Sequence, residues 1–146
     1  MTENDDDAAR RIYKEWHEGF TARDLDRVMV LYAEDAVIET PAVLSMYPGA
    51  EEGILRGRQN IRELFERNFK ALAGTFEGLY RSELFLSNGR YLLWEYPRLK
   101  PTGEQVDLIE SMDIDEGHIR YHRVYWGWRG MAALIRNRES RGASPD

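Results

Sequence analysis

The sequence predicts a single α+β domain in which the helices come first and an antiparallel sheet follows. Two observations lead to this prediction. Apolar residues recur at helical spacing through the first half of the chain, up to about residue 72. From residue 76 onward, alternating segments are separated by turn-forming dipeptides, of which Asn88-Gly89 is the clearest. Because the helices precede the strands instead of alternating with them, the order favours α+β over α/β.

Composition excludes several classes of function. The chain has 146 residues, no cysteine, 26 acidic and 20 basic residues, and a formal net charge of −6. The lack of cysteine removes disulfide, thiolate and cysteine-zinc chemistry. An acidic balance argues against a nucleic-acid partner, since phosphate binding needs clustered Lys and Arg. Because no apolar run reaches ~18 residues and no signal peptide is recognised, we expect no membrane partner and a cytoplasmic location.

We expect an acidic disordered tail over residues 1–8, one domain over residues 9–136 and a flexible tail over residues 137–146. The first helix opens the domain, because its apolar residues form a single stripe at helical spacing. The stripe comprises Ala9, Ile12, Tyr13, Trp16 and Phe20. A short second helix is capped near Asp24. The residues on its buried side are Leu25, Val28, Met29 and Tyr32.

The sequence next predicts a brief strand over residues 36–40, which Pro41 ends because proline cannot donate a ladder hydrogen bond. Residues 41–57 are predicted to form a long loop, and loops of this length are typically functional, so we expect it to act as a lid. A third helix is predicted over residues 58–72, with Gly74 just past its end.

Four strands are predicted in the second half of the chain. They span residues 76–86, 90–99, 105–114 and 118–128, and a last helical turn covers residues 130–135. Asn88-Gly89 suits a two-residue turn that pairs Phe85 with Leu92. Three consecutive hairpins make an antiparallel meander with the helices on one face. Because the other face also carries apolar residues, we expect a homodimer formed through the sheet.

Glu110 is the most informative residue of the predicted strand over residues 105–114. It stands on a face whose other members are apolar, namely Val106, Leu108, Met112 and Ile114. A carboxylate among aliphatic groups costs several kcal/mol unless it is paired or protonated. Glu110 is therefore a candidate general acid or base. The alternative is a structural glutamate bonded to a neighbouring strand or reaching an edge of the sheet.

His122 is the candidate partner of Glu110. A turn centred on Glu116 would place the two residues opposite each other on one face, where they could shuttle a proton. One group would then set the tautomer of the other. A register slip of one residue would turn His122 outward. The alternative is a structural histidine of the core whose ring N–H donates a hydrogen bond to a backbone carbonyl.

Aromatic residues make up 12% of the chain, and most of them are core. An interior rich in rings also favours a flat-walled cavity for a polycyclic or aromatic ligand. The residues expected to line it are Tyr13, Trp16, Phe20, Thr40, Trp94, Met112 and Trp126. No metal or cofactor site is predicted. His17-Glu18 does not begin a zinc-binding helix, because position 21 is Thr, and the sequence has no glycine-rich phosphate loop.

Several stretches resemble the SnoaL-like and ketosteroid-isomerase-like branch of the NTF2-like superfamily. They are DLDR at residues 24–27, LYAEDAVIETP at residues 31–41, GRQNI at residues 57–61, and DLIESMDIDEG at residues 107–117 followed by Tyr125-Trp126. The resemblance covers about residues 9–135. It implies a cone in which a curved antiparallel sheet wraps around three N-terminal helices. It also implies a ligand cavity at the open end and dimerisation through the sheet.

The resemblance also bears on the reaction. Ketosteroid isomerases use a Tyr on the first helix, an Asp before the Pro and an Asp in the penultimate strand. The corresponding positions here are Trp16, Thr40 and Glu110. The general base and one oxyanion donor are missing, which argues against steroid isomerisation by that mechanism. SnoaL-like cyclases are thought to deprotonate a carbon next to a carbonyl with an acidic residue and a polar partner, and Glu110 with His122 is compatible with this.

The sequence favours a cofactor-free enzyme that moves a proton next to a carbonyl, in cyclisation, isomerisation or dehydration of a small hydrophobic substrate. Glu110 would be the acid or base and His122 its partner. The alternative is a non-catalytic ligand-binding or dimerisation module, which the missing catalytic positions favour. An enzyme should place Glu110 and His122 on an open cavity, whereas a module would fill that cavity with Trp16 and Trp126.

Overall fold

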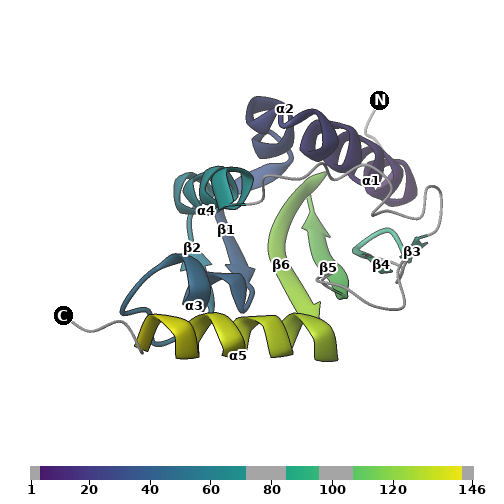
Figure 1. Cartoon of the computed structure of the whole chain (residues 1–146). Coiled ribbons are helices and arrows are strands. Elements are labelled where there is room, and N and C mark those ends of the chain that lie inside the picture. The colour runs from purple at the N-terminus through teal and green to yellow at the C-terminus, as the bar shows by residue number, and fades with distance from the viewer. Residues whose placement is uncertain (1–3, 72–84, 96–106, 143–146) are drawn as a thin grey trace.

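A curved six-stranded sheet with helices on one side forms the molecule (Figure 1). The computed structural model describes residues 4–71, 85–95 and 107–142. The helices are α1 (Asp5–Ala22), α2 (Leu25–Met29), α3 (Ala42–Met46), α4 (Arg58–Ala71) and α5 (Trp128–Gly142). The strands are β1 (Tyr32–Glu39), β2 (Ile54–Arg56), β3 (Leu86–Ser87), β4 (Tyr91–Glu95), β5 (Leu108–Asp115) and β6 (His118–Trp126). The predicted α+β class is confirmed.

The sheet order is β2-β1-β6-β5-β4-β3. Every pairing is antiparallel except that of β1 with β6, which is parallel. We call the face that packs against α1 and α4 the inner face. Helix α5 lies against α3 and β6, below the ends of the strands (Figure 1). No helix in the described ranges is both long and apolar enough to cross a membrane.

Helix α1 begins earlier than the sequence predicts. The side chain of Asn4 accepts a hydrogen bond from the Asp7 N–H at 3.0 Å, so the helix starts at Asp5, inside the segment expected to be a tail. Ala8 is already buried. Helix α2 begins as predicted, because the Asp24 carboxylate accepts from the Arg27 N–H at 3.0 Å, but it ends at Met29, and Tyr32 starts β1 instead of lying on the helix.

The segment between α2 and α4 is more regular than predicted. The strand expected over residues 36–40 starts at Tyr32, because its first residue already pairs with Ile119 of β6. The loop expected over residues 41–57 contains α3 and β2. Gly53 closes this segment tightly against β1: the Thr40 N–H donates to its carbonyl at 2.7 Å. A Cβ at Gly53 would lie 2.8 Å from the Thr40 carbonyl oxygen, which explains the glycine.

Both described hairpins differ in register from the prediction. In the first, Leu86 pairs with Leu93 instead of Phe85 pairing with Leu92, because the turn has moved one residue along. Its tip is Gly89, at φ 90°, and the Asn88 side chain accepts from the Arg90 N–H at 3.2 Å. In the second hairpin, Asp115 pairs with His118 and a bulge follows. The predicted segments over residues 76–84, 96–99 and 100–103 lie outside the described residues.

Helix α5 is much longer than the expected helical turn and includes residues 137–142, which the sequence analysis assigned to a tail. Its first turn is tied to the start of β5. The Asp107 carboxylate accepts from the Gly130 N–H at 3.0 Å, and the Asp107 carbonyl accepts from the Gly127 N–H at 2.7 Å. Asp107 therefore caps a helix that follows it by twenty residues, an interaction that local sequence patterns do not reveal.

Replacing Asp107 should loosen α5. In Asp107→Ala the buried Gly130 N–H loses its acceptor and the helix loses a negative charge at its N-terminus, so the free energy of unfolding should fall by about 1–2 kcal/mol. Urea unfolding followed by circular dichroism measures this. The matched control is Glu139→Ala on the exposed side of α5, expected within about 0.5 kcal/mol of the wild type. Equal losses in both variants would contradict the capping role.

Candidate functional site

Glu110 and His122 meet inside the molecule. They lie on the inner faces of β5 and β6, and their exposed fractions are 4% and 1%. The Nε2 atom of His122 is hydrogen-bonded to Oε2 of Glu110. The two residues are diagonal neighbours: His122 pairs with Met112, and Glu110 with Val124. The expected directly opposite register was wrong by two residues, but an even shift keeps both side chains on the predicted face.

Hydrogen bonds link the Glu110–His122 pair to two further buried side chains. The Tyr32 hydroxyl lies 2.8 Å from Nδ1 of His122, and Nε1–H of Trp16 donates to that hydroxyl at 3.1 Å. Trp16 and Tyr32 are 1% and 0% exposed. Residues from α1, β1, β6 and β5 thus form one hydrogen-bonded chain. We call Trp16, Tyr32, His122 and Glu110 the buried relay.

The relay fixes the proton on His122. An indole N–H can only donate, so the Tyr32 oxygen accepts from Trp16. The hydroxyl's own hydrogen then goes to Nδ1 of His122, since these two are its hydrogen-bond partners within the described ranges. His122 is therefore neutral with its proton on Nε2, which donates to the Glu110 carboxylate. Burial raises the pKa of Tyr32 well above its usual value of 10.0, so the phenol keeps its hydrogen.

Tyr32 was predicted as an apolar residue of the second helix and not as a site residue, but it is the first residue of β1 and a member of the relay. The signal was available, because a fully buried tyrosine needs a partner for its hydroxyl. The partner could not be identified from the sequence, since Tyr32 and His122 are 90 residues apart.

His17 is a second residue that the sequence analysis did not place at the site. Its Nδ1–H donates to the Tyr13 carbonyl at 2.6 Å, so in the neutral ring Nε2 carries the lone pair. Its ring centroid lies 4.7 Å from that of Trp94. Burial lowers the pKa of His17 below its usual value of 6.5, and the hydrogen bond to the Tyr13 carbonyl and the negative charge of Glu110 partly offset this. His17 therefore adds a neutral imidazole to the surroundings of Glu110.

Four of the expected pocket residues form one aromatic cluster beside the relay. Trp16 stacks on Phe20 at 4.5 Å between centroids and contacts Trp94 at 5.3 Å. Tyr13 meets Trp94 edge-on at 5.5 Å. Trp94 pairs with Glu110 across β4 and β5, so this cluster flanks the carboxylate. The edge contact of Trp16 with His122, at 6.2 Å, joins the cluster to the relay.

Of the remaining expected pocket residues, Met112 and Trp126 lie on the inner face and Thr40 lies just beyond β1. Met112 is fully buried opposite His122, and Trp126 is half-buried at the end of β6. Thr40 is buried, and its hydrogen bonds within the described residues are local: the hydroxyl accepts from the Ala42 N–H at 3.2 Å at the start of α3. These hydrogen bonds explain the burial of the Thr40 hydroxyl without a ligand.

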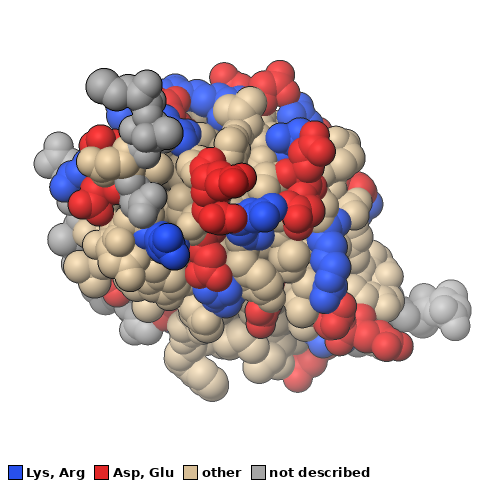
Figure 2. All heavy atoms as spheres, turned by 180° about the vertical axis from the view of Figure 1, so that it is seen from behind, with Lys and Arg blue, Asp and Glu red and all other residues tan. Residues whose placement is uncertain are grey.

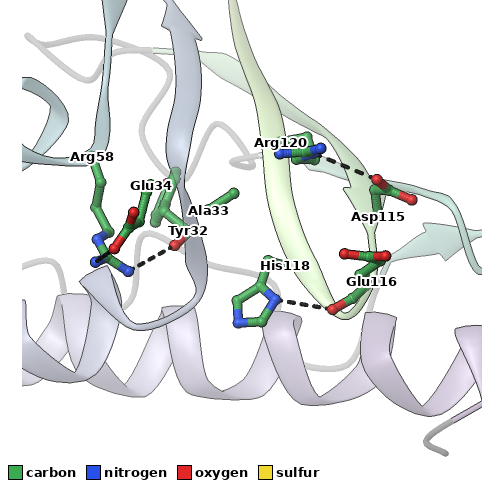
Figure 3. Close-up of a pocket in the computed structure, with 8 residues that line it drawn as sticks. All are labelled: Tyr32, Ala33, Glu34, Arg58, Asp115, Glu116, His118 and Arg120. Carbon is green, nitrogen blue, oxygen red and sulfur yellow. Dashed lines mark hydrogen bonds and ion pairs between the residues drawn. The ribbon is translucent and has the colours of Figure 1, made fainter.

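An open surface pocket of about 230 Å³ lies near the turn between β5 and β6 (Figure 3). It is lined by Tyr32, Ala33, Glu34, Arg58, Asp115, Glu116, His118 and Arg120. Its two arginines form ion pairs within the pocket: Arg120 lies 3.5 Å from Asp115, and Arg58 lies 3.5 Å from Glu34 (Figure 3). Water screens such exposed groups. Because this pocket is lined by neither Glu110 nor His122, the candidate site is the buried relay. Tyr32 is the one residue that both lines the pocket and belongs to the relay.

Charges on the surface are mixed in sign. On the face shown in Figure 2, basic and acidic side chains lie interspersed instead of gathering by sign. Ion pairs such as Arg62 with Asp26, at 2.7 Å, join helices across the surface. This is not the pattern of a phosphate-binding surface, which carries basic residues in a patch or stripe.

Known proteins match this chain in sequence pattern and in fold. Residues 13–122 match the family model of the SnoaL-like domain. A SnoaL-like protein of Burkholderia thailandensis has a TM-score of 0.62 at 17% identity, covering 82% of this chain and 95% of that one. TerC, co-crystallised with polyporic acid, has a TM-score of 0.64 at 16% identity, with coverages of 88% and 98%.

A candidate polyketide cyclase of Sinorhizobium meliloti has a TM-score of 0.58 at 22% identity and covers 79% of this chain and 94% of its own. At these identities the structural similarity shows the fold alone. No curated protein matches the sequence.

His17 should make stability depend on pH. Because its pKa is lowered in the folded state, the unfolded chain binds a proton that the folded chain does not, between that lowered pKa and 6.5. The free energy of unfolding should therefore rise with pH across this window. Urea unfolding between about pH 5 and pH 7 should show a smaller slope for His17→Gln than for the wild type. The exposed His118→Gln is the control and should keep the wild-type slope; an unchanged slope in His17→Gln would contradict the assignment.

Proposed function

Because this chain belongs to the SnoaL-like domain family, we propose that it is a cofactor-free enzyme that moves a proton next to a carbonyl of a small hydrophobic substrate. Glu110 is the acid–base group and His122 orients it. The observation that carries the proposal is the buried relay: a carboxylate that is 4% exposed, held by a histidine whose tautomer Tyr32 and Trp16 determine.

The relay supports Glu110 as the base in the first half of the reaction. His122 donates its Nε2–H to one carboxylate oxygen, which holds the carboxylate in one orientation. A carboxylate shielded from bulk water takes a proton without first losing an ordered water shell. The same carboxyl group then returns the proton to another atom of the substrate, which completes an isomerisation, cyclisation or dehydration.

The surroundings of Glu110 support a substrate with flat apolar parts. Trp94 and Trp16 present ring surfaces beside the relay, and Tyr13 stacks on Phe85 at 4.5 Å. Aromatic faces favour planar ligands. Two of the structurally similar proteins have names that fit this chemistry, one a candidate polyketide cyclase and the other a protein co-crystallised with polyporic acid.

The second candidate is a non-catalytic module that binds a small ligand or dimerises. It is supported by Trp16 and Thr40, which occupy two of the three catalytic positions of ketosteroid isomerases. Trp16 is also fully packed between Phe20 and Trp94, so it fills space that an enzyme of that type uses for a catalytic tyrosine. The two candidates differ in whether Glu110 exchanges protons with a ligand.

Proton exchange on a probe ketone separates the two candidates. We expect the wild type to accelerate the exchange of the acidic ring protons of 2-tetralone with deuterium oxide, followed by NMR. Glu110→Gln removes the proton acceptor and keeps the size of the side chain, so the enzymatic rate should fall by about 10²–10⁴-fold. Glu139→Gln, on exposed α5, should keep the wild-type rate.

Two results would contradict the catalytic proposal. One is a Glu110→Gln variant that exchanges 2-tetralone protons at the wild-type rate. The other is a wild type that binds 2-tetralone and leaves its exchange rate unchanged, which would favour the non-catalytic module.

We also propose that two copies of the chain associate through the outer face of the sheet. Ile109 and Tyr125 pair across β5 and β6 on that face and are 39% and 55% exposed. Adjacent exposed apolar side chains on a sheet favour burial against a partner.

Sedimentation velocity tests the association. The wild type should sediment as a dimer and Ile109→Lys as a monomer with an unchanged circular dichroism spectrum, because a lysine cannot be buried there without a partner. Val30→Lys is the control, since Val30 is 64% exposed at the end of α2 and is not part of a strand. A monomeric wild type, or an Ile109→Lys variant that stays dimeric, would overturn the proposed interface.

A further inference from the structure

Within the described residues, two buried indole N–H groups meet no hydrogen-bond acceptor. The Nε1 atoms of Trp94 and Trp126 are buried, and no hydrogen-bond partner reaches either one from the residues that the structure describes. Trp16 differs, since its Nε1–H donates to Tyr32 at 3.1 Å. Folded proteins rarely leave a buried N–H without an acceptor, because the group has lost water and gained nothing in return. A hydrogen-bond acceptor on a bound ligand would compensate for the lost hydrogen bond to water.

Both indoles lie on the same face as Glu110. Trp94 is directly opposite Glu110 across β4 and β5. Val124 is opposite Glu110 on the other side, and Trp126 follows it by two residues on the same face of β6. Directly opposite side chains in a sheet start about 5 Å apart, and diagonal ones about 7–8 Å. Trp94 is therefore a direct cross-strand neighbour of Glu110, and Trp126 is a diagonal neighbour on the opposite side.

Trp94 is held in place more firmly than Trp126. It is 3% exposed, and its ring contacts those of His17, Trp16 and Tyr13 at 4.7, 5.3 and 5.5 Å. Such packing fixes the direction of the N–H before any ligand arrives, as electrostatic stabilisation of a developing charge requires. Trp94 is thus the main donor, and Trp126 is a second donor nearer the end of the sheet.

We propose that Trp94 Nε1–H donates a hydrogen bond to a ligand oxygen, and that this oxygen is the carbonyl next to the carbon that Glu110 deprotonates. Trp126 Nε1–H, on the same face of the sheet two strands away, is a second donor to the ligand. The ligand class is therefore an enolisable carbonyl compound fused to or carrying a flat ring, or a phenolate that imitates its enolate. This inference rests on the proposed function and specifies the substrate class and the group that polarises it.

The step balances without a cofactor. The bond between carbon and hydrogen next to the carbonyl breaks, and its proton forms an O–H bond on Glu110. The electron pair of the broken bond becomes a carbon–carbon double bond, and the carbonyl electrons move onto oxygen. An indole N–H cannot transfer its own proton to that oxygen, but a hydrogen bond to the charged enolate is stronger than one to the neutral ketone. The donor therefore favours the enolate over the starting compound.

Binding of 2-naphthol tests the donor. In protein labelled with nitrogen-15 at tryptophan, 2-naphthol is added and its hydroxyl proton passes to Glu110, which leaves the bound naphtholate beside a neutral carboxyl group. The indole N–H proton signals of Trp94 and Trp126 should move downfield, and that of the exposed Trp128 should stay unchanged. Replacing Trp94 by 3-benzothienylalanine exchanges the N–H for sulfur and keeps the ring size. This replacement should weaken naphtholate binding by about tenfold or more, because one charge-assisted hydrogen bond is lost.

Two controls separate the effect of losing the N–H donor from the effect of changing the ring. The same replacement at Trp128 should leave naphtholate binding unchanged. Binding of naphthalene, which has no oxygen, should be the same in the wild type and in the Trp94 replacement. The Trp94 replacement should also fold at least as stably as the wild type, because the N–H that it removes has no partner in the described part of the chain.

The results distinguish this inference from the proposed function. If the Trp94 replacement binds naphtholate as tightly as the wild type, or if the indole signals exchange with water and do not shift with the probe, the donor role is overturned. In that case the exchange of 2-tetralone protons could still depend on Glu110. If the Trp94 replacement weakens naphtholate binding while the wild type does not accelerate the exchange of 2-tetralone protons, Trp94 is confirmed as a donor to a ligand oxygen and the catalytic proposal fails.

Discussion

The hydroxyl of Tyr32 is the group on which the candidate site depends. It accepts from an indole that can only donate, and it passes its own hydrogen to His122. This leaves the histidine with one proton, on the nitrogen that faces Glu110. Four buried polar groups are thereby satisfied by one another, and a carboxylate can be held inside an aromatic interior. A relay with fewer members would leave a buried donor, acceptor or charge uncompensated.

The fold brings the relay together through one unusual pairing. β1 runs parallel to β6 with Ile38 beside His122, while β5 runs antiparallel to β6 on its other side. Register shifts occur in both ladders: in β1 between Tyr32 and Val37, and in β5 between Asp113 and Ile114. They adjust where the side chains of neighbouring strands meet. Trp16 reaches Tyr32 from α1, so the correct packing of the first helix on the inner face is also a condition for the site.

Much of the architecture could be predicted from local patterns, since alternation identifies a buried face and turn residues identify hairpins. Glu110 and His122 were assigned to the correct face in this way, and the expected family resemblance is confirmed. The patterns failed where an interaction joins distant segments. The parallel partner of β1 and the Asp107 cap on α5 both depend on contacts between residues far apart in sequence. The bulge that moves Glu110 opposite Val124 lies within one hairpin, but no turn residue marks it. Hydrophobic periodicity shows that a position is buried but not whether its side chain makes a buried hydrogen bond. Tyr32 and His17 were therefore not predicted as site residues.

The tautomer of His122 tests the relay most directly. Two-bond hydrogen–nitrogen correlation spectra of protein labelled with nitrogen-15 at histidine report which ring nitrogen carries the proton. At about neutral pH the relay requires a neutral His122 with the proton on Nε2 and an unprotonated Nδ1 that accepts from Tyr32. A proton on Nδ1, in either the other neutral tautomer or an imidazolium, would show that Tyr32 does not direct the histidine toward Glu110, and the account of the site would be wrong.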